Sequence, residues 1–325
     1  MYVDALIDRQ KDIIHVVERV NGKRVHRDYP ARYVFYYKDS HGKFESIFGD
    51  KLERVVTTSG KNFAKEKKLY SGQRLFESDV NPVFRCLADN YLGADTPKLQ
   101  QAFFDIEVDF DKDKGFADPS DPFNPVTAIS VHLDWIGKTI CLVNKPKTLT
   151  KADAQIIVSR FEDTILIDTE DELLGTFLDL IEDADVMSGW NSEGFDIPYM
   201  VNRIARVLGK EHTRRFCLWG QYPKKREFER YGKNQETYDT VGRLHLDYME
   251  LYRKYTYHEM HSYSLDAIGE YELGERKTEY QGTLDQLYNN DFETFIRYSR
   301  QDVDLLVRMD KKLQFIDLAN VIAHD

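Results

Sequence analysis

The sequence predicts an α/β domain with a mixed central sheet, preceded by a β-rich amino-terminal domain (α+β overall). Three observations support this fold class. Hairpin signals dominate the first hundred residues, strands and helices alternate after residue 99, and the carboxyl-terminal segments have helical patterns. At 325 residues the chain is long for one domain, so we expect two, over residues 1–98 and 99–325.

The clearest turn signal of the amino-terminal region is Asn21-Gly22. Both residues tolerate positive φ, as a type I′ turn requires, so the flanking apolar-polar runs are predicted to pair as a hairpin. The predicted elements are strands over residues 13–20 and 23–29, a second hairpin over 33–37 and 44–48 around His41-Gly42, and a helix over 81–91.

Beyond a connector at Thr96-Pro97, predicted strands alternate with predicted helices, which is the pattern of a mixed α/β sheet. The predicted strands cover residues 102–109, 126–135, 138–143, 164–168 and 186–190. The predicted helices cover residues 170–183, 197–208, 265–272 and 292–318. Pro198 suits a first helical turn, because its missing N–H has no partner to lose there.

The net charge of −11 does not favour a nucleic-acid partner, because phosphate contacts need Lys and Arg. It does not exclude one, since a metal-dependent nuclease gathers carboxylates and a basic groove can be local. Three clusters could contribute to such a groove, although each is better explained alone as solvated surface charge. They are Lys61, Lys65, Lys67 and Lys68, then Arg214 and Arg215, then Lys224, Lys225 and Arg226.

The three cysteines, Cys86, Cys141 and Cys217, are scattered and odd in number. They indicate neither a disulfide framework nor a zinc cluster. The chain shows no signal-peptide pattern and no run as long as a membrane span. We therefore expect a cytoplasmic protein with no membrane partner.

Asp105 and Glu107 alternate with Phe104 and Ile106 in a predicted strand. Side chains of a strand alternate, so the two carboxylates share one face while Phe104 and Ile106 point into the core. Two carboxylates on one face repel each other unless a cation lies between them, and a divalent metal is the simplest such cation. An exposed strand edge explains the motif as well, since Asp168-Thr-Glu170 has the same spacing.

Residues 190–196, Trp-Asn-Ser-Glu-Gly-Phe-Asp, lie between a predicted strand and a predicted helix. This position puts Asp196 at the carboxyl end of a strand, where α/β sheets bind ligands. Taken alone, Asp196 is better explained as a helix cap.

Tyr298 and Asp302 are four residues apart in a predicted helix and therefore lie on one face, a turn from each other. The spacing is common, because Tyr91 and Asp95 match it too. An amphipathic helix with an exposed Asp explains it in isolation.

The order of the three segments is hard to obtain by chance, and it resembles the three motifs of DEDD 3′–5′ exonucleases in the tyrosine branch. Further segments resemble the proofreading domains of family B DNA polymerases, with those of tailed bacteriophages most similar. These segments are residues 188–191, 196–199, 246–252 and 262–266. The resemblance covers residue 99 to the end well and residues 1–100 more loosely.

The resemblance implies a ribonuclease H-like exonuclease domain that hydrolyses the 3′-terminal phosphodiester with two divalent ions and releases 5′-mononucleotides. Mg²⁺ or Mn²⁺ is implied, because carboxylate and water oxygens suit these hard ions. In the implied site Asp105 bridges the ions, Glu107 and Asp302 complete the site of the attacking water, and Asp196 serves the second ion. Tyr298 orients the water; its ordinary pKa near 10 makes it a poor base.

Three residues are predicted to hold the last nucleotides of a single-stranded or frayed DNA end, by stacking or hydrogen bonding: Phe104, Asn191 and Phe195. Core packing explains the two phenylalanines equally well. Residues 227–231 and 236–241 flank Gly232-Lys233-Asn234 and predict a hairpin. Phage enzymes of the family have a strand-separating hairpin at the matching place, and an ordinary surface hairpin is the alternative.

No segment resembles the metal-binding and nucleotide-binding motifs of the polymerase domain. We therefore expect no DNA synthesis by this chain alone. The expected partners are single-stranded or primer-template DNA and a polymerase half, in the same or a separate chain, through which a sliding clamp could be reached. If the protein is viral, the expected location is the host cytoplasm.

Two other functions remain open from the sequence. The chain could be a nucleic-acid-binding or polymerase-docking subunit of a split polymerase, with incidental nuclease activity; an apolar surface near residues 315–322 would support this. It could also be a free-standing DEDD ribonuclease. The β-rich amino-terminal region and the hairpin argue against the ribonuclease, which requires neither.

Overall fold

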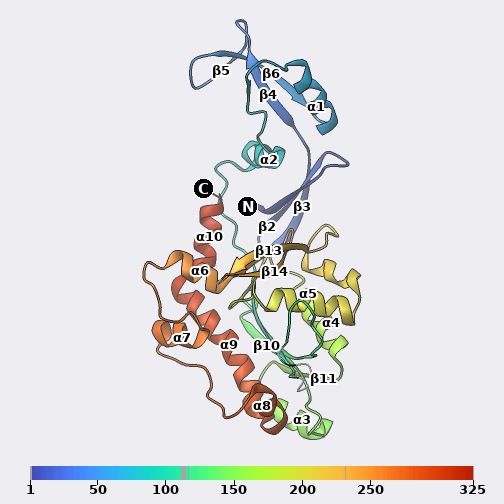
Figure 1. Ribbon diagram of the computed structural model, residues 1–325, viewed down its shortest axis with the longest axis vertical. Coiled ribbons are helices and arrows are strands. Elements are labelled where there is room, and N and C mark those ends of the chain that lie inside the picture. The colour runs from blue at the N-terminus through green and yellow to red at the C-terminus, as the bar shows by residue number, and fades with distance from the viewer. Residues whose placement is uncertain (1, 111–114, 116, 231, 325) are drawn as a thin grey trace. The chain divides into compact units, whose positions relative to one another are not determined.

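The computed structural model describes residues 2–110, 115, 117–230 and 232–324. They divide into two compact units, Met1–Lys98 and Leu99–Asp325 (Figure 1). The predicted mixed α/β architecture with a β-rich amino-terminal part is confirmed. Within the described residues, no helix is both long and apolar enough to cross a bilayer.

The first sheet of the smaller unit confirms the hairpin predicted around Asn21-Gly22. Its strands are β1 (Tyr2–Asp8), β2 (Ile13–Val20) and β3 (Lys23–Pro30), in that order and antiparallel. Asn21 and Gly22 have φ of 50° and 74°, as a type I′ turn requires.

The second sheet corrects one prediction. Its order is β5 (Phe44–Glu45), β6 (Lys51–Thr57), β4 (Tyr33–Lys38) and β7 (Leu75–Phe76), so β5 pairs with β6 and not with β4. The reason is a tight turn over residues 46–50, where the Ser46 N–H donates to the Asp50 carbonyl at 2.9 Å. This turn reverses the chain, so the expected reversal at His41-Gly42 does not pair the two strands.

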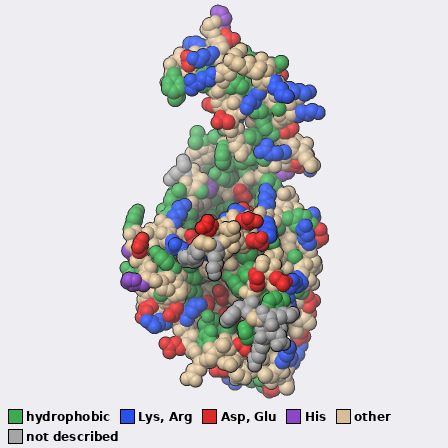
Figure 2. Space-filling model, viewed as in Figure 1, with side chains coloured by type: hydrophobic (Ala, Val, Ile, Leu, Met, Phe, Trp, Pro, Cys, Tyr) green, Lys and Arg blue, Asp and Glu red, His purple; other side chains and the backbone are tan. Residues whose placement is uncertain are grey.

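Two helices complete the smaller unit. The predicted helix is α2 (Pro82–Tyr91), whose Asn81 side chain caps the Val83 N–H. The other helix, α1 (Gly60–Leu69), was not predicted and buries none of its residues. It carries Lys61, Lys65, Lys67 and Lys68, and Figure 2 shows Lys and Arg side chains to be frequent on the visible face of this unit. Residues 1–98 carry 18 Lys and Arg against 14 Asp and Glu, so the acidic excess of the chain belongs to residues 99–325.

The larger unit is built on a six-stranded mixed sheet in the order β11-β10-β9-β8-β12-β15. Its strands are β8 (Gln101–Val108), β9 (Val126–Leu133), β10 (Lys138–Asn144), β11 (Thr164–Ile167), β12 (Val186–Gly189) and β15 (Leu244–Asp247). The pairs of β9 with β8 and with β10 are antiparallel, and the other neighbours are parallel. This arrangement, with β8 at the centre, is ribonuclease H-like.

Helices cover both faces of this sheet, and a two-stranded hairpin stands apart from it (Figure 1). The helices are α3 (Lys151–Val158), α4 (Glu170–Leu180), α5 (Asp196–Val207), α6 (Tyr248–Tyr255), α7 (Leu265–Leu273), α8 (Leu284–Asn290), α9 (Phe292–Leu313) and α10 (Phe315–His324), with a 3₁₀ turn over Lys210–Phe216. The hairpin consists of β13 (Lys224–Arg230) and β14 (Lys233–Asp239). Tyr231, expected at the end of its first strand, lies outside the described residues.

The two faces of β8 meet different helices. Phe104 and Ile106 join a core formed with α4 and α5, which includes Phe177 and Ile197. Helix α9 packs on β8, β9 and β10 from the other face. The alternation expected for this strand therefore places Asp105 and Glu107 on the face that α9 covers.

The helix predicted over residues 292–318 is two helices. Gln314 adopts φ of 54°, a left-handed conformation that ends α9, and α10 starts at the next residue. Periodicity did not show this break, because apolar residues continue through it.

Candidate active site

Asp105 and Glu107 lie in the middle of the sheet, because β8 is hydrogen-bonded on one side to β9 and on the other to β12. Glu107 is 6% exposed. Burial of a carboxylate is costly unless something pairs with its charge, so the strand presents two acids in a place that calls for a cation.

Helix α9 brings Asp302 and Tyr298 to the same face. Its depth on the sheet is set by small side chains: Ser299 and Ser130 are fully buried, and their hydroxyl oxygens are 2.9 Å apart. Ser130 is the cross-strand neighbour of Asp105. The hydrogen bond between the two serines therefore joins the helix that carries Asp302 to the strand next to Asp105.

The result is a cluster of three acids. One carboxylate oxygen from each of Asp105, Glu107 and Asp302 lies within 4.8 Å of the others. Oε1 of Glu107 and Oδ1 of Asp302 are buried and have no hydrogen-bond partner within the described residues. Unpaired buried carboxylate oxygens are the ligands that Mg²⁺ and Mn²⁺ take, so the residues present fit a divalent ion.

The electrostatics of the cluster point the same way. Burial raises the pKa of Asp105 well above its ordinary value, and repulsion from Glu107, Asp302 and Asp196 adds to the rise. Burial likewise raises the pKa of Glu107, and repulsion from Asp302 is the next largest cause of the rise. Without added positive charge these acids tend to hold protons, and a divalent cation would reverse that preference.

Lys277 is a site residue that the sequence did not reveal. Its ammonium nitrogen is 2.5 Å from Oδ2 of Asp302 and 3.4 Å from the Tyr298 hydroxyl oxygen. Its backbone N–H donates to Asp266, in the first turn of α7, at 2.8 Å. Burial lowers the pKa of Lys277, but attraction to Asp302, Tyr298 and Asp105 outweighs it, so the pKa is raised and the side chain is charged.

Tyr298 lies beside this ammonium, and Lys277 Nζ is 5.3 Å from the centre of its ring. Tyr280 packs on the ring edge-to-face with centroids 5.3 Å apart. Burial, followed by repulsion from Asp302 and Glu107, raises the pKa of Tyr298 above its ordinary value. The phenol is therefore neutral at pH 7 and can donate a hydrogen bond.

Asp196 begins α5 and lies outside the three-acid group within the described residues. Its Oδ1 accepts the Ile106 N–H of β8 at 3.3 Å, so it stands against the strand that carries Asp105. Burial raises the pKa of Asp196 to about 7. The helix-cap explanation does not describe it, because Phe195 occupies the N-cap position of α5.

The loop before α5 is held in an unusual shape. Asn191 has φ of 57°, and Asp247 accepts the N–H of Asn191 at 3.1 Å and of Glu193 at 3.0 Å. Gly189 leaves no room for a side chain, because a Cβ there would be 2.9 Å from the Phe104 carbonyl oxygen. These contacts fix where the loop delivers Asp196 relative to β8.

The three predicted substrate contacts differ in their surroundings. Phe104 is fully buried and packs on Phe177 with centroids 5.7 Å apart, so the prediction that it stacks on a base is wrong. Its own strand alternation turns it away from Asp105. Phe195 and Asn191 are partly exposed, and Phe195 stacks on Tyr199.

Buried acids on the central strand of a ribonuclease H-like sheet, with a lysine and a tyrosine beside them, fit a metal-dependent hydrolase. Residues 54–268 match the family model of the DNA polymerase family B exonuclease domain, which is well over half of the chain. The chain therefore belongs to this family. It contains the exonuclease domain of family B DNA polymerases.

Three relatives illustrate the relationship. The DNA-directed DNA polymerase of Escherichia phage RB69 is 32% identical over 256 residues, which are 72% of this chain and 28% of the relative. The DNA-directed DNA polymerase of Enterobacteria phage T4 is 33% identical over 153 residues, 46% of this chain and 17% of the relative. DNA polymerase 1 of Saccharolobus solfataricus is 25% identical over 284 residues, 84% of this chain and 28% of the relative. The chain thus spans less than a third of the length of each.

Proposed function

We propose that this chain removes nucleotides one at a time from the 3′ ends of single-stranded or frayed DNA, with two divalent ions as cofactors. The observation that carries the proposal is the convergence of Asp105, Glu107 and Asp302, two of whose oxygens are buried without a partner. A metal-dependent exonuclease needs such a cluster, and a module that only binds or docks does not.

The acids divide the work of holding the ions. Asp105, together with Glu107 and Asp302, would hold one ion, and Asp196, against the same strand, would contribute to the second. When bound, Mg²⁺ or Mn²⁺ lowers the pKa of water and neutralises the charge that develops on the phosphate and on the leaving 3′ oxygen. The product that leaves is a 5′-mononucleotide.

Two neighbouring side chains act on the attacking water and the phosphate. The neutral hydroxyl of Tyr298 orients the water by a hydrogen bond. It does not take the water's proton, because its raised pKa keeps the phenol itself protonated at pH 7. The charged ammonium of Lys277 lies between Tyr298 and Asp302 and stabilises negative charge where the phosphate reacts.

The 3′ end is held by the loop before α5. Asn191 and Phe195 are partly exposed in this loop; Asn191 would hydrogen-bond the terminal nucleotide, and Phe195 would stack on a base. The hairpin β13–β14 would help to separate a primer end from its template. A single strand reaches the acids more easily than a duplex, so unpaired ends are the preferred substrate.

The remaining partners follow from the family. The relatives are DNA polymerases several times longer than this chain, so we infer that the exonuclease works beside a polymerase half on primer-template DNA, and with a sliding clamp through that half. Because two of these relatives belong to phages, we place the activity in the cytoplasm of a host cell.

The test is digestion of a single-stranded oligonucleotide labelled at its 5′ end, with Mg²⁺ and with EDTA. The expected result is a ladder that shortens from the 3′ end, is absent in EDTA and is absent in an Asp105→Ala/Glu107→Ala variant. An oligonucleotide left intact by the wild type in Mg²⁺ would overturn the proposal and favour a binding or docking role. The family match favours the exonuclease over that role.

A further inference from the structure

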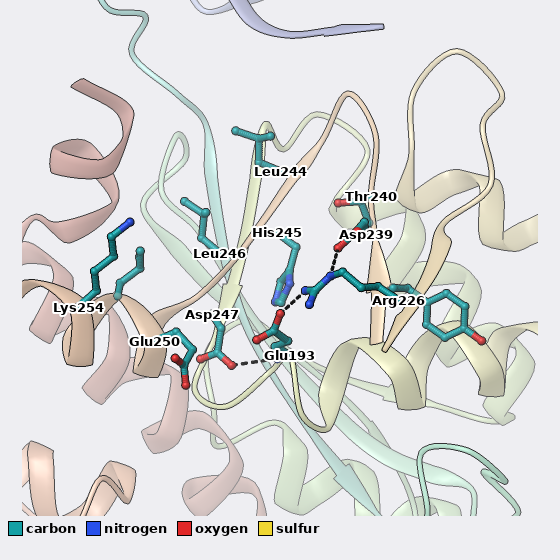
Figure 3. A pocket seen from close by; sticks show the side chains of 12 residues that line it. Glu193, Arg226, Asp239, Thr240, Leu244, His245, Leu246, Asp247, Glu250 and Lys254 are labelled. Carbon is teal, nitrogen blue, oxygen red and sulfur yellow. Dashed lines mark hydrogen bonds and ion pairs between the residues drawn. The ribbon is translucent and has the colours of Figure 1, made fainter. Parts of the chain in front are cut away.

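Two arginines attach the hairpin to the loop that carries Asn191. Arg226 and Arg230 are four residues apart on β13 and therefore on one face of the strand. Arg226 pairs with Glu193 and with Asp239, and it lines a cavity of about 470 Å³ at the root of the hairpin. Figure 3 shows Arg226 reaching Glu193 and Asp239 in this cavity, with Asp247 and Glu250 nearby.

The side chain of Arg230 is more deeply buried than that of Arg226. It is 8% exposed, against 41% for Arg226. The guanidinium forms an ion pair with Glu250 of α6 and lies 3.9 Å from both Glu193 and Asp247. Its other nitrogen, Nη1, donates to Oδ1 of Asn191 at 2.5 Å. A buried guanidinium among three carboxylates has one stable orientation, so the atom that faces Asn191 is fixed.

The chemistry of the two groups decides which way the Asn191 amide points. A guanidinium has only donors, so the amide must turn its oxygen toward Arg230. Its nitrogen then faces away, and within the described residues that nitrogen has no hydrogen-bond partner. The Asn191 backbone cannot adjust, because its N–H is held by Asp247 and its φ is 57°.

Gly194 supplies a second observation of the same contact. A Cβ at this position would lie 3.0 Å from Oδ1 of Asn191 and 3.1 Å from Nη1 of Arg230. Both distances are shorter than ordinary van der Waals contact, so a side chain at position 194 would press on this hydrogen bond. The loop thus leaves space for the arginine and the amide to meet.

We propose that Arg230 is a positioning residue that fixes the polarity of the Asn191 amide, so that Asn191 presents two N–H donors to an acceptor oxygen of the 3′-terminal nucleotide. The proposal rests on the exonuclease function proposed above. It also gives the hairpin a second role, because Arg230 belongs to β13. A displacement of the hairpin would release the amide and weaken the hold on the 3′ end.

The test is a double-mutant cycle between Arg230→Gln and Asn191→Ala. Binding of a 5′-fluorescein-labelled dT₁₂ is followed by anisotropy with Ca²⁺ in place of Mg²⁺, and a gel verifies that the strand stays intact. Each single variant is expected to bind about tenfold more weakly, as for a lost hydrogen bond to a charged or desolvated partner. The double variant should bind no more weakly than Asn191→Ala, because Arg230 acts through Asn191.

Two further variants separate positioning from folding. Gly194→Ala keeps every charge and is expected to weaken binding several-fold by disturbing the same hydrogen bond. Arg160→Gln removes an exposed arginine that pairs with Glu293, outside the loop and the hairpin, and should leave binding within about twofold. Urea midpoints of all variants verify that the protein is folded.

Two results would overturn the positioning role of Arg230. In one, the affinity losses of the two single variants multiply in the double variant. In the other, folded Arg230→Gln binds dT₁₂ as tightly as the wild type does. Digestion by the wild type in Mg²⁺ is measured in the same series and reports on the exonuclease separately. If the wild type digests the oligonucleotide and the losses of the two single variants multiply, only the role of Arg230 fails. If the wild type does not digest, the exonuclease proposal fails, whatever the cycle shows.

Discussion

Replacing Asp196 by Asn is expected to stabilise the metal-free protein while abolishing its activity. Burial raises the pKa of Asp196 from an ordinary 3.8 to about 7. In the unfolded chain the pKa returns to its ordinary value. The folded state thus binds a proton that the unfolded state releases, and the wild type loses stability as the pH rises from about 4 through 7.

The size of the effect follows from the two pKa values. Each pKa unit corresponds to about 1.4 kcal/mol, so the ionised carboxylate costs about 4 kcal/mol above pH 7, about 2 kcal/mol at pH 5.5 and nothing below pH 4. Asn is never ionised, so it avoids the free-energy cost of a buried charge, and its side chain has the same shape as that of Asp. The gain from Asp196→Asn should therefore grow with pH over this window.

The assay is urea unfolding in EDTA at pH 5.5 and pH 8, with Asp171→Asn as the matched control. Asp171 is an exposed acid in the first turn of α4, and its replacement should change the unfolding free energy by less than about 0.5 kcal/mol at either pH. Mg²⁺ should reduce the difference in unfolding free energy between Asp196→Asn and the wild type at pH 8, because a bound cation favours the ionised carboxylate of Asp196. A variant less stable than wild type at pH 8, or an advantage independent of pH, would refute the reasoning.

Other expectations follow from single contacts. Lys277→Met should lower kcat about 100-fold with KM changed less than threefold, because the ammonium acts on the reacting phosphate and not on the rest of the strand. Steady-state kinetics with a labelled oligonucleotide measures both constants. A raised KM at unchanged kcat would contradict this role of Lys277. Tyr298→Phe should lower kcat about tenfold without removing a limb of the pH–rate profile between pH 6 and 9, since the phenol donates and is not a base; a lost limb would show that it titrates. Gly189→Ala should cost about 2 kcal/mol or more in urea unfolding, because the added methyl meets the Phe104 carbonyl oxygen; an unchanged midpoint would contradict the close packing at this position.

Local periodicity was enough to predict the strand and helix that carry most of the site. The alternation in residues 102–109 and the four-residue spacing of Tyr298 and Asp302 both describe single elements, and both elements exist. Their meeting is a tertiary event. It became predictable only because the order of the three segments resembled a known family.

The residues that were missed come from segments whose positions depend on the whole fold. Lys277 lies in an irregular stretch between α7 and α8, where no period or spacing marks a residue that reaches Asp302. Arg230 looks like one more charge in a polar hairpin, and its burial appears only once the hairpin packs against α6. Phe104 was misassigned although its strand alternation already pointed it to the core.

Strand pairing was the other weak point. The turn over residues 46–50 has a local hydrogen bond from Ser46 to Asp50, but His41-Gly42 is the more conspicuous signal in the sequence. Which turn reverses the chain depends on β6, which occupies the edge of β4. A contact with a strand later in the chain cannot be read from the turn residues alone.

The most direct test of the central claim is hydrolysis of a single-stranded DNA in water enriched in ¹⁸O, with the products analysed by mass spectrometry. Attack of water on the terminal phosphate predicts 5′-mononucleotides that each carry one ¹⁸O in the phosphate, formed with Mg²⁺ and absent in the Asp105→Ala/Glu107→Ala variant. Internal fragments, 3′-phosphates, or mononucleotides that persist in the variant would contradict a 3′–5′ exonuclease built on these carboxylates.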